Sequence, residues 1–426
     1  MNHPASSRLH FLDWVRILAF MLLILYHVGM YYVSWDWHVK SPHASDAIEP
    51  LMMLSSPWRL GLLFLISGVA SSFMLSKMKA ARFMGQRSVR LLVPLVFGMF
   101  VIVPPQAYFE VIEKVAYQGS YLDFMRLYVS GYGGFCRKTD CLDMPTWNHL
   151  WFVAYLWAYT LLLGAIVLLA GQRFEALSKT VASWLTGWKL IVLPVALLGL
   201  ARIMLLSKFP TTHDLINDWY NHAQYLGLFL LGAMLARQAG VWQRMEAIRW
   251  ASLGIALACW AAVIIWLSLP ESTTMLPNFN YFRMAMRVVY TLCAWCAIVA
   301  VCGFAHRHLN FDNAGRRYLS QAVFPVYIVH QTLIVSMAHL IKPADVAPAA
   351  EGLVLVVLTL CFSFGIVEVV KRVGVLRPLF GLGWVAGHSR AQSSRKHSAG
   401  LTGAPAFNDA STKENAARLC SGAACL

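Results

Sequence analysis

The sequence predicts an all-α fold: an integral membrane bundle of about ten transmembrane helices with both termini in the cytoplasm. Apolar residues make up 58% of the 426 positions, against roughly half in soluble domains. They gather in long runs with few charges, which is the pattern that a bilayer requires. Lys and Arg are concentrated in alternate connections between these runs, as the positive-inside rule predicts for a multi-pass protein.

A membrane span needs about 20 apolar residues, and ten runs approach this length. They cover roughly residues 12–33, 58–76, 91–109, 148–170, 189–206, 219–237, 250–269, 285–304, 321–341 and 351–370. The first run lacks an Ala-x-Ala-like cleavage site, so it is expected to be a retained span and not a signal peptide. The longest outer connection, 108–147, is rich in Tyr, Gly and charged residues.

Basic residues follow the second, fourth, sixth, eighth and tenth spans, whereas connections such as 34–57 and 342–350 are nearly neutral or acidic. An even number of spans with both termini cytoplasmic explains this alternation. Residues 1–385 then form one membrane domain. Residues 386–426 are rich in Ser, Ala, Gly and basic residues, and they are expected to form a disordered cytoplasmic tail.

The net charge of +15 does not indicate nucleic acid as a partner, because the basic residues follow the connections and the tail and not one face beside aromatic residues. Cys136 and Cys141 share the longest outer connection, and they could form a disulfide if it faces an oxidising compartment. No metal site is expected, since Cys293 and Cys296 lack a second cysteine pair or nearby His ligands.

The first span reads FLDWVRILAFMLLILYHVGMYY and carries ionisable residues that a bilayer normally excludes. Arg16 and His27 are eleven residues apart, about three helical turns, so they project from nearly the same face about 16 Å apart. Asp13 lies one turn before Arg16, at a spacing that permits an ion pair.

Two interpretations of these residues are open. Asp13 and Arg16 could be interfacial charges, and His27 could be a hydrogen-bonded packing residue. Their alignment on one stripe favours function instead, because a neutral imidazole can take a proton from a hydroxyl group near physiological pH.

Other spans place polar residues in the outer half of the predicted bundle. Asn148, His149 and Trp151 open the fourth span, and His330 lies near the middle of the ninth. Arg59 and Arg202 occur in or beside the second and fifth spans. A single arginine could simply extend to the lipid headgroups, whereas several could surround an anionic group of a substrate.

Arg82, Arg87 and Arg90 lead into the third span on the cytoplasmic side. The positive-inside rule explains such charges without a binding role. Arg87 and Arg90 are nevertheless one turn apart if the segment is helical, a spacing that suits phosphate groups. No Walker motif, GxSxG elbow or HExxH helix is present.

An ordered set of short stretches gives a family resemblance. These are LDWVRILAFMLLILYH, WDWHVKS, LLFLISG, RSVR, NHLWFVAYL, AHRHLNF and VFPVYIVHQ, and they cover most of residues 9–372. The chain resembles the acyltransferase-3 family of integral membrane acyltransferases. Within it, the chain looks most like the succinyltransferases that modify periplasmic glucans in the bacterial inner membrane.

The resemblance implies roles for several residues. His27 would be catalytic together with Arg16, and the RxxR arginines, Arg87 and Arg90, would help to bind the acyl donor, assisted by Arg82. His38, in a stretch seen in the glucan branch, would lie near the acceptor. Where glucan enzymes often show a His pair in the ninth span, this chain has His330 followed by Gln331, which leaves the substrate open.

These observations predict transfer of an acyl group, succinyl or acetyl, from cytoplasmic acyl-CoA to a glycan hydroxyl on the outer side. Acyl-CoA would be a co-substrate, with no bound cofactor. His27 would act as general base, and a covalent acyl-His intermediate is a second route. The predicted substrate-binding residues are Arg59, Arg202, His38, Asn148, His149, Trp151 and His330. The alternative function is a transporter or flippase that uses the intramembrane charges as a substrate path.

Overall fold

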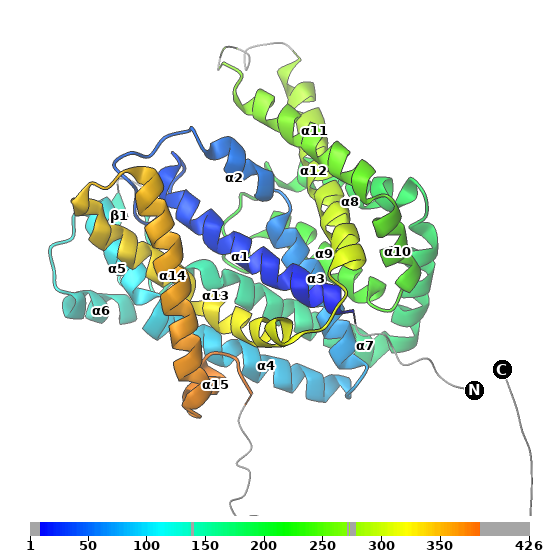
Figure 1. The fold of residues 1–426 in the computed structure, drawn as a ribbon, viewed down its shortest axis with the longest axis horizontal. Coiled ribbons are helices and arrows are strands. Elements are labelled where there is room, and N and C mark those ends of the chain that lie inside the picture. Colours follow the sequence, from blue (N-terminus) through cyan, green and yellow to red (C-terminus); the bar gives the residue numbers. More distant parts are fainter. Residues whose placement is uncertain (1–8, 138–139, 271, 273–277, 384–426) are drawn as a thin grey trace, which may run out of the picture. The chain divides into compact units, whose positions relative to one another are not determined.

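The computed structural model describes residues 9–137, 140–270, 272 and 278–383, which form a bundle of helices (Figure 1). The predicted tail, 386–426, lies outside the described residues. The long helices are α1 (His10–Tyr32), α3 (Arg59–Leu75), α4 (Ala80–Phe97), α7 (Trp151–Trp184), α8 (Lys189–Leu205), α9 (Trp219–Leu235), α11 (Arg249–Leu267), α12 (Phe279–His308), α13 (Ala314–Ile341) and α14 (Pro348–Arg372). Shorter helices are α2 (Glu49–Ser55), α5 (Pro104–Val115), α6 (Tyr121–Val129), α10 (Ala239–Ala247) and α15 (Leu376–Leu379).

Nine of the ten predicted spans each lie mainly on one long helix of the described residues, and the third, 91–109, is divided between α4, a π-helical turn and α5. In the part of the chain that the structure describes, eight helical segments are long and apolar enough to cross a membrane, and α9 with α10 forms a further pair bent by 111°. The remaining helix, α8, has 17 residues and is short for a span of about 20. The all-α multi-pass membrane bundle is therefore confirmed, while the cytoplasmic placement of both termini stays a prediction.

The third span differs from its predicted limits of 91–109. Helix α4 begins at Ala80, continues as a π-helical turn over Gly98–Ile102 and gives way to α5 at Pro104. Proline lacks a backbone N–H, so it suits the first turn of a new helix better than the interior of the old one. As a result Arg82, Arg87 and Arg90 lie on the span itself and not in the connection before it.

The expected connection 108–147 is also more ordered than its composition suggested. It contains most of α5, then α6 and a short antiparallel hairpin of β1 (Cys136–Arg137) and β2 (Asp140–Cys141). The disulfide between Cys136 and Cys141 is present. Buried Phe124 and Tyr128 pack against α5 and form a small apolar core of their own. This cluster of aromatic residues gives the connection a fixed structure.

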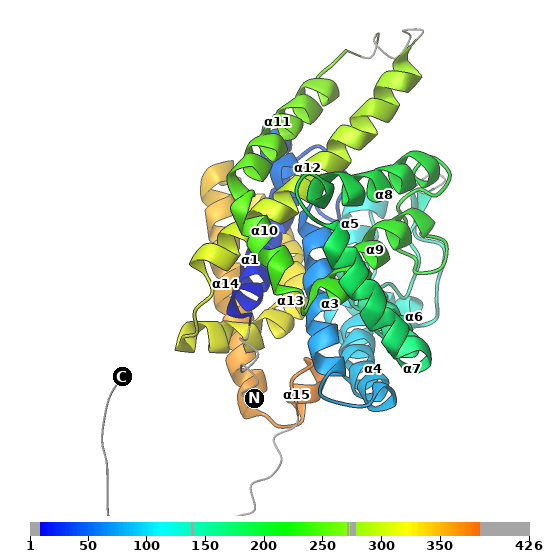
Figure 2. The same ribbon diagram turned by 90° about the vertical axis from the view of Figure 1, so that its right-hand side faces the viewer.

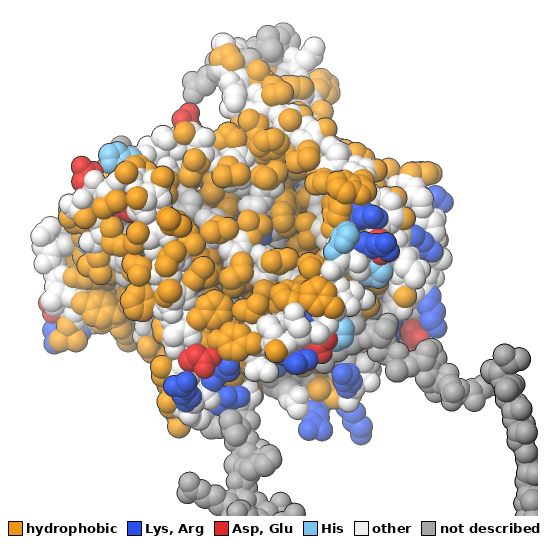
Figure 3. Space-filling view, viewed as in Figure 1, with side chains coloured by type: hydrophobic (Ala, Val, Ile, Leu, Met, Phe, Trp, Pro, Cys, Tyr) orange, Lys and Arg blue, Asp and Glu red, His pale blue; other side chains and the backbone are white. Residues whose placement is uncertain are grey.

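Charged and apolar residues are segregated on the surface of the bundle. Figure 3 shows a broad apolar face with Lys and Arg side chains along its lower and right-hand edges, where Figure 1 places α4, α10 and α15. This separation is what a bilayer imposes on a protein that crosses it. Figures 1 and 2 both show α11 and α12 extending as a pair beyond the neighbouring helices.

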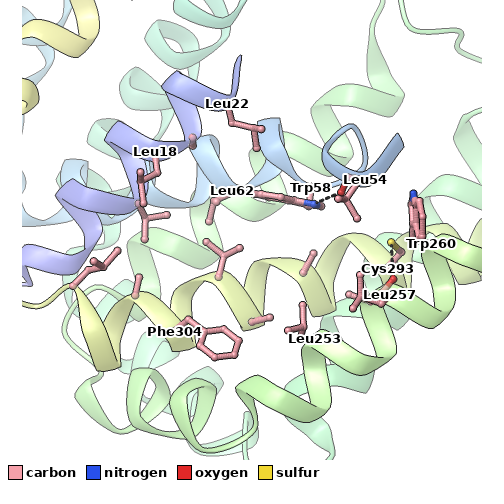
Figure 4. Close-up of a pocket in the computed structure, with 18 of the residues that line it drawn as sticks. Leu18, Leu22, Leu54, Trp58, Leu62, Leu253, Leu257, Trp260, Cys293 and Phe304 are labelled. Atoms are coloured by element: carbon pink, nitrogen blue, oxygen red, sulfur yellow. Dashed lines mark hydrogen bonds between the residues drawn. The ribbon is translucent and has the colours of Figure 1, made fainter. Parts of the chain in front are cut away.

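Helix α1 occupies the middle of the bundle and packs against α3, α12, α13 and α14. On one side, an apolar groove of about 590 Å³ runs between α1, α3, α11 and α12 (Figure 4). Leu18, Trp58, Trp260 and Phe304 are among its walls. Such a surface suits contact with lipid chains, and it is distinct from the polar cavities described below.

Helices α3 and α9 cross at two glycines that allow their backbones to touch. A Cβ atom on Gly68 would lie 1.9 Å from the carbonyl oxygen of Phe229, and one on Gly232 would lie 2.0 Å from that of Leu65. Small residues at such crossings are a common feature of membrane helices, because close backbone approach maximises van der Waals contact. This crossing fixes the position of α3 and therefore of Arg59 at its start.

We predict that Gly232→Leu separates α3 from α9, since the new side chain meets backbone that cannot move aside. Overpacking of a core typically costs about 1–3 kcal/mol, and we expect at least that loss here, seen as a lower thermal unfolding temperature of the purified protein. The matched control is Gly254→Leu on α11, where an added Cβ has no atom within 4 Å. An unchanged unfolding temperature for Gly232→Leu would show that the two helices are not in contact.

Candidate functional site

Two cavities inside the bundle share one wall. The first, of about 460 Å³, is lined by aromatic side chains together with polar groups, and we call it the aromatic cavity. The second, of about 430 Å³, contains two arginines, and we call it the arginine cavity. Both are lined by Tyr26, His27, Leu60, Trp151 and His213, and by Arg59. His27 therefore lies where the two cavities adjoin.

His27 on α1 pairs with His330 on α13. The Nδ1 atom of His27 lies 2.9 Å from Nε2 of His330, and the two rings are stacked at an angle of 7°. The other nitrogen of His330, Nδ1, lies 2.6 Å from the carbonyl oxygen of Tyr327. His330 is fully buried, and the described residues provide no hydrogen-bond partner for Nε2 of His27. One nitrogen of His27 is thus held by the protein, and the other is free to act.

His38 lies in the segment between α1 and α2 and lines the aromatic cavity. Its Nδ1 is 2.5 Å from the carboxylate of Glu110 on α5, which also forms an ion pair with Lys114 at 2.9 Å. Burial acts to raise the pKa of Glu110, but the charges and hydrogen bonds of His38 and Lys114 outweigh it and lower this pKa to about 2. Glu110 is therefore ionised at neutral pH and orients the His38 ring.

An amide network connects His38 to the start of α7. The side chain of Gln331 donates to Nε2 of His38 at 2.9 Å and to the Oε1 atom of Gln106 at 3.1 Å. The same Gln106 oxygen accepts from Asn148 at 3.3 Å. His149 lies 3.1 Å from the carbonyl oxygen of Ile328 through Nε2. These contacts fix the polar wall of the aromatic cavity before any substrate enters.

Arg59 is a buried cation without a carboxylate partner among the described residues. Its side chain is only 3% exposed, and its guanidinium stacks 3.6 Å above the Tyr26 ring. One nitrogen donates to Ser55 at 3.2 Å, whereas Nε has no partner in the described chain. A buried charge of this kind is costly unless an opposite charge joins it. The arrangement therefore suits an anionic group.

Arg202 shows the same features at the far side of the arginine cavity. Its guanidinium lies 3.8 Å from the centre of the Tyr290 ring and donates to the Tyr220 hydroxyl at 2.5 Å. It forms no ion pair with an Asp or Glu of the described segments, and its Nε is buried without a partner. Two arginines held by aromatic rings give this cavity a positive potential.

A second basic cluster lies away from His27, about 16 Å along α1 by the helical rise. Here the charges of Arg16, Arg87 and Arg90 are close enough to interact. Arg16 lies 3.6 Å from Asp13, but Asp13 has a closer partner in the buried Arg316. We call Arg16, Arg87 and Arg90 the α1–α4 arginine cluster.

The predicted site residues therefore fall into two groups. The aromatic cavity is lined by His27, His38, Arg59, Asn148, His149 and Trp151. The arginine cavity is lined by Arg202 together with Arg59 and Trp151. His330 lies behind His27. Arg16, Arg87 and Arg90 form the separate cluster, and Arg82 is exposed on the first turn of α4. Their functional roles stay predictions. In the parts of the chain that the structure describes, no group of His, Cys, Asp or Glu is arranged to hold a metal ion.

Several residues of the site were not identified from the sequence. Gln106 falls in the predicted third span, Glu110 falls in the predicted connection 108–147, and Tyr327 has no feature that distinguishes it from the other aromatic residues of the spans. Pro104-Pro105 followed by an amphipathic run could have indicated α5. The pairing of Glu110 with His38 is a contact between distant segments and has no local signal.

Comparisons with known proteins give the family of the chain. The acyltransferase domain family matches residues 9–368. The chain is similar to glucans biosynthesis protein C of Escherichia coli strain K12 and of strain O9:H4 (strain HS), with 26% identity over 350 residues in each case. This alignment covers 80% of the chain and 86% of each relative. No solved structure matches the chain.

Proposed function

Because this chain belongs to the acyltransferase-3 family of membrane O-acyltransferases, we propose that it moves an acyl group from cytoplasmic acyl-CoA to a hydroxyl of a periplasmic or cell-surface glycan. The relatives named glucans biosynthesis protein C favour a glucan as the acceptor. For the location of this multi-pass protein we propose the bacterial inner membrane. The observation that carries the proposal is the free Nε2 of His27 at the junction of two chemically different cavities.

The aromatic cavity is suited to the acceptor sugar. Trp37, Trp147 and Trp151 offer flat apolar surfaces against which the C–H faces of a sugar ring can pack. His38 and Asn148 on the same wall can form hydrogen bonds with hydroxyl groups. A sugar bound there would present a hydroxyl group to His27.

His27 would act as the general base. Its Nε2 would take the proton from the acceptor hydroxyl while the oxygen attacks the thioester carbonyl carbon. Arg59, which lines both cavities, would stabilise the negative charge that develops on the carbonyl oxygen. The C–S bond would then break, and the CoA thiolate would take the proton from the His27 imidazolium. In the second route, Nε2 of His27 attacks the thioester carbonyl and CoA leaves as the thiolate. The acceptor hydroxyl then attacks the acyl-imidazole, the C–N bond breaks to restore His27, and the hydroxyl proton passes to the thiolate.

The α1–α4 arginine cluster is the proposed donor site. Arg87 and Arg90 are one turn apart on α4, and Arg16 joins them from α1. In this proposal the cluster binds the phosphates of CoA, with Arg82 assisting at the surface. The pantetheine arm would then extend about 16 Å along α1 and place the thioester beside His27.

The arginine cavity favours an acyl group that carries its own carboxylate. Arg59 and Arg202 have unpaired donors and no acidic partner in the described residues. A succinyl group could present its thioester to His27 and its free carboxylate to Arg202. An acetyl group would leave Arg202 without this partner, so we favour succinyl over acetyl.

We predict that His27→Ala reduces release of CoA and labelling of glucan by about 10²–10⁴-fold, the usual contribution of a general base. The measurement uses purified protein with labelled acyl-CoA and glucan, and the thermal unfolding temperature controls for folding. Retained labelling in His27→Ala would show that His27 is not the general base. Labelled substrate that crosses vesicles unmodified would support the transporter alternative.

We predict that the double substitution Arg87→Glu with Arg90→Glu weakens CoA binding by at least about 10²-fold, because charge-assisted hydrogen bonds are worth roughly 1.5–3 kcal/mol each. Binding of CoA to the purified protein measures this directly. The matched control, Lys77→Glu with Lys79→Glu, makes the same change of charge at two exposed positions just before α4. Equal affinity in the double variant and the control would place the donor elsewhere.

We predict that Arg202→Gln lowers kcat/KM for succinyl-CoA by about 10–10²-fold and changes that for acetyl-CoA by less than about threefold. The control is Arg287→Gln on α12, since Arg287 contacts Ile203 and Ser207 and lines neither cavity. If both donors were affected alike, Arg202 would have a structural role instead of selecting the acyl group.

A further inference from the structure

We propose that His330 is a positioning residue that holds the His27 imidazole in the tautomer required of a general base. This inference rests on the proposed function of His27. It assigns His330 a role different from the substrate contact that its position in the sequence suggested, because His330 is fully buried and lies behind His27.

The hydrogen bonds determine where the protons lie. A carbonyl oxygen can only accept, so the 2.6 Å contact with Tyr327 requires a proton on Nδ1 of His330. In a neutral imidazole, Nε2 of His330 is then an acceptor. The 2.9 Å contact with His27 consequently requires a proton on Nδ1 of His27. This leaves Nε2 of His27 with its lone pair, which is the form that can accept a proton from a hydroxyl group.

The surroundings of His330 favour the neutral form. No carboxylate of the described residues lies within ion-pair distance of its ring. Its closest neighbours include the His149 ring, in an edge-to-face arrangement at 5.2 Å, and the Tyr327 ring at 5.7 Å. A buried imidazolium without an anionic partner would be strongly disfavoured. His330 can therefore serve as an acceptor for His27.

His330 is itself fixed by its own helix. The Tyr327 carbonyl lies three residues earlier on α13, so the orientation of the His330 ring depends only on local geometry. The Tyr327 hydroxyl in turn donates to the backbone carbonyl of His149, which ties α13 to the start of α7. The His27 ring on α1 is thus oriented by a rigid hydrogen-bond acceptor, His330, on the neighbouring helix α13.

Three of the other histidines in the aromatic cavity and its walls have both ring nitrogens occupied, so they do not compete for the role of base. His38 contacts Glu110 through Nδ1 and Gln331 through Nε2. His149 contacts the Ile328 carbonyl through Nε2 and Gln106 through Nδ1. Both ring nitrogens of each are therefore engaged, as are both of His330. His213 also lines both cavities, stacked on Trp151 at 4.1 Å, and its ring has no hydrogen-bond partner among the described residues. Within the described site, His27 is the histidine that has one ring nitrogen held by a hydrogen bond and the other free.

Three substitutions of His330 test the positioning role. Gln can place its amide oxygen near the position of Nε2 and still accept from His27. Asn is polar too, but its amide reaches only as far as Nδ1, so the acceptor for His27 is lost. Phe keeps the ring shape without any acceptor. The matched control is His339→Gln, on the same helix, since His339 pairs with Glu113 and lines neither cavity.

We expect kcat to fall by about 10²-fold in His330→Phe and His330→Asn, within the range that a general base contributes. KM for glucan should stay within about threefold, and His330→Gln should recover most of the lost kcat. A merely structural role would lower the amount of folded protein and would not distinguish Gln from Asn. If His330→Phe does not fold, the comparison of Gln with Asn still decides.

Two results would overturn the proposal. Unchanged kcat in His330→Asn would show that His27 needs no acceptor at this position. A higher KM with unchanged kcat in all variants would make His330 a substrate contact. Failure of the wild-type protein to transfer an acyl group would instead contradict the proposed function itself, and this outcome is distinct because it does not depend on any variant.

Discussion

The bilayer's intolerance of unpaired polar groups is the constraint on which this structure depends. Most buried charges obey it: Arg316 pairs with Asp13 and Asp312, and Glu351 accepts from the hydroxyls of Tyr31 and Tyr32. These contacts join α1 to α13 and α14. Five buried arginine Nε donors lack partners in the described residues. Those of Arg59 and Arg202 lie together in the arginine cavity, those of Arg16 and Arg87 lie in the α1–α4 arginine cluster, and the fifth belongs to Arg249. The first two pairs are places where an anionic ligand can supply what the protein does not.

Helix α1 connects the two sites, because it carries Arg16 of the α1–α4 arginine cluster and His27 at the junction of the cavities. Arg16 lies near the arginines of α4, and His27 lies about three turns further along, at the junction of the two cavities. A single rigid helix in the middle of the bundle therefore sets the distance between the proposed binding site of the donor and the base. The close crossing of α3 and α9 at Gly68 and Gly232 fixes α3, and α3 in turn places Arg59 at the same junction of the two cavities as His27.

Much of this could be predicted from the sequence, because span length, loop charge and helical spacing are local properties. The all-α bundle, with eight or nine candidate spans among the described residues, and the single helix that bears Arg16 and His27 followed from them. The break at Pro104 and the π-helical turn before it were missed, since an apolar run of the right length concealed them. The partners of His27 and His38 were also missed. His330 is 303 residues from His27 and Glu110 is 72 from His38, and only the packing of helices brings such residues together.

The central claim is that the acyl group crosses the bundle from one side of the membrane to the other. Sealed proteoliposomes test it most directly, with labelled acyl-CoA supplied only outside and glucan enclosed only inside. We expect label on the enclosed glucan with the wild-type protein, no label with His27→Ala, and no label above that background when both substrates are outside. Label that appears only when donor and acceptor share one side would contradict transfer across the membrane.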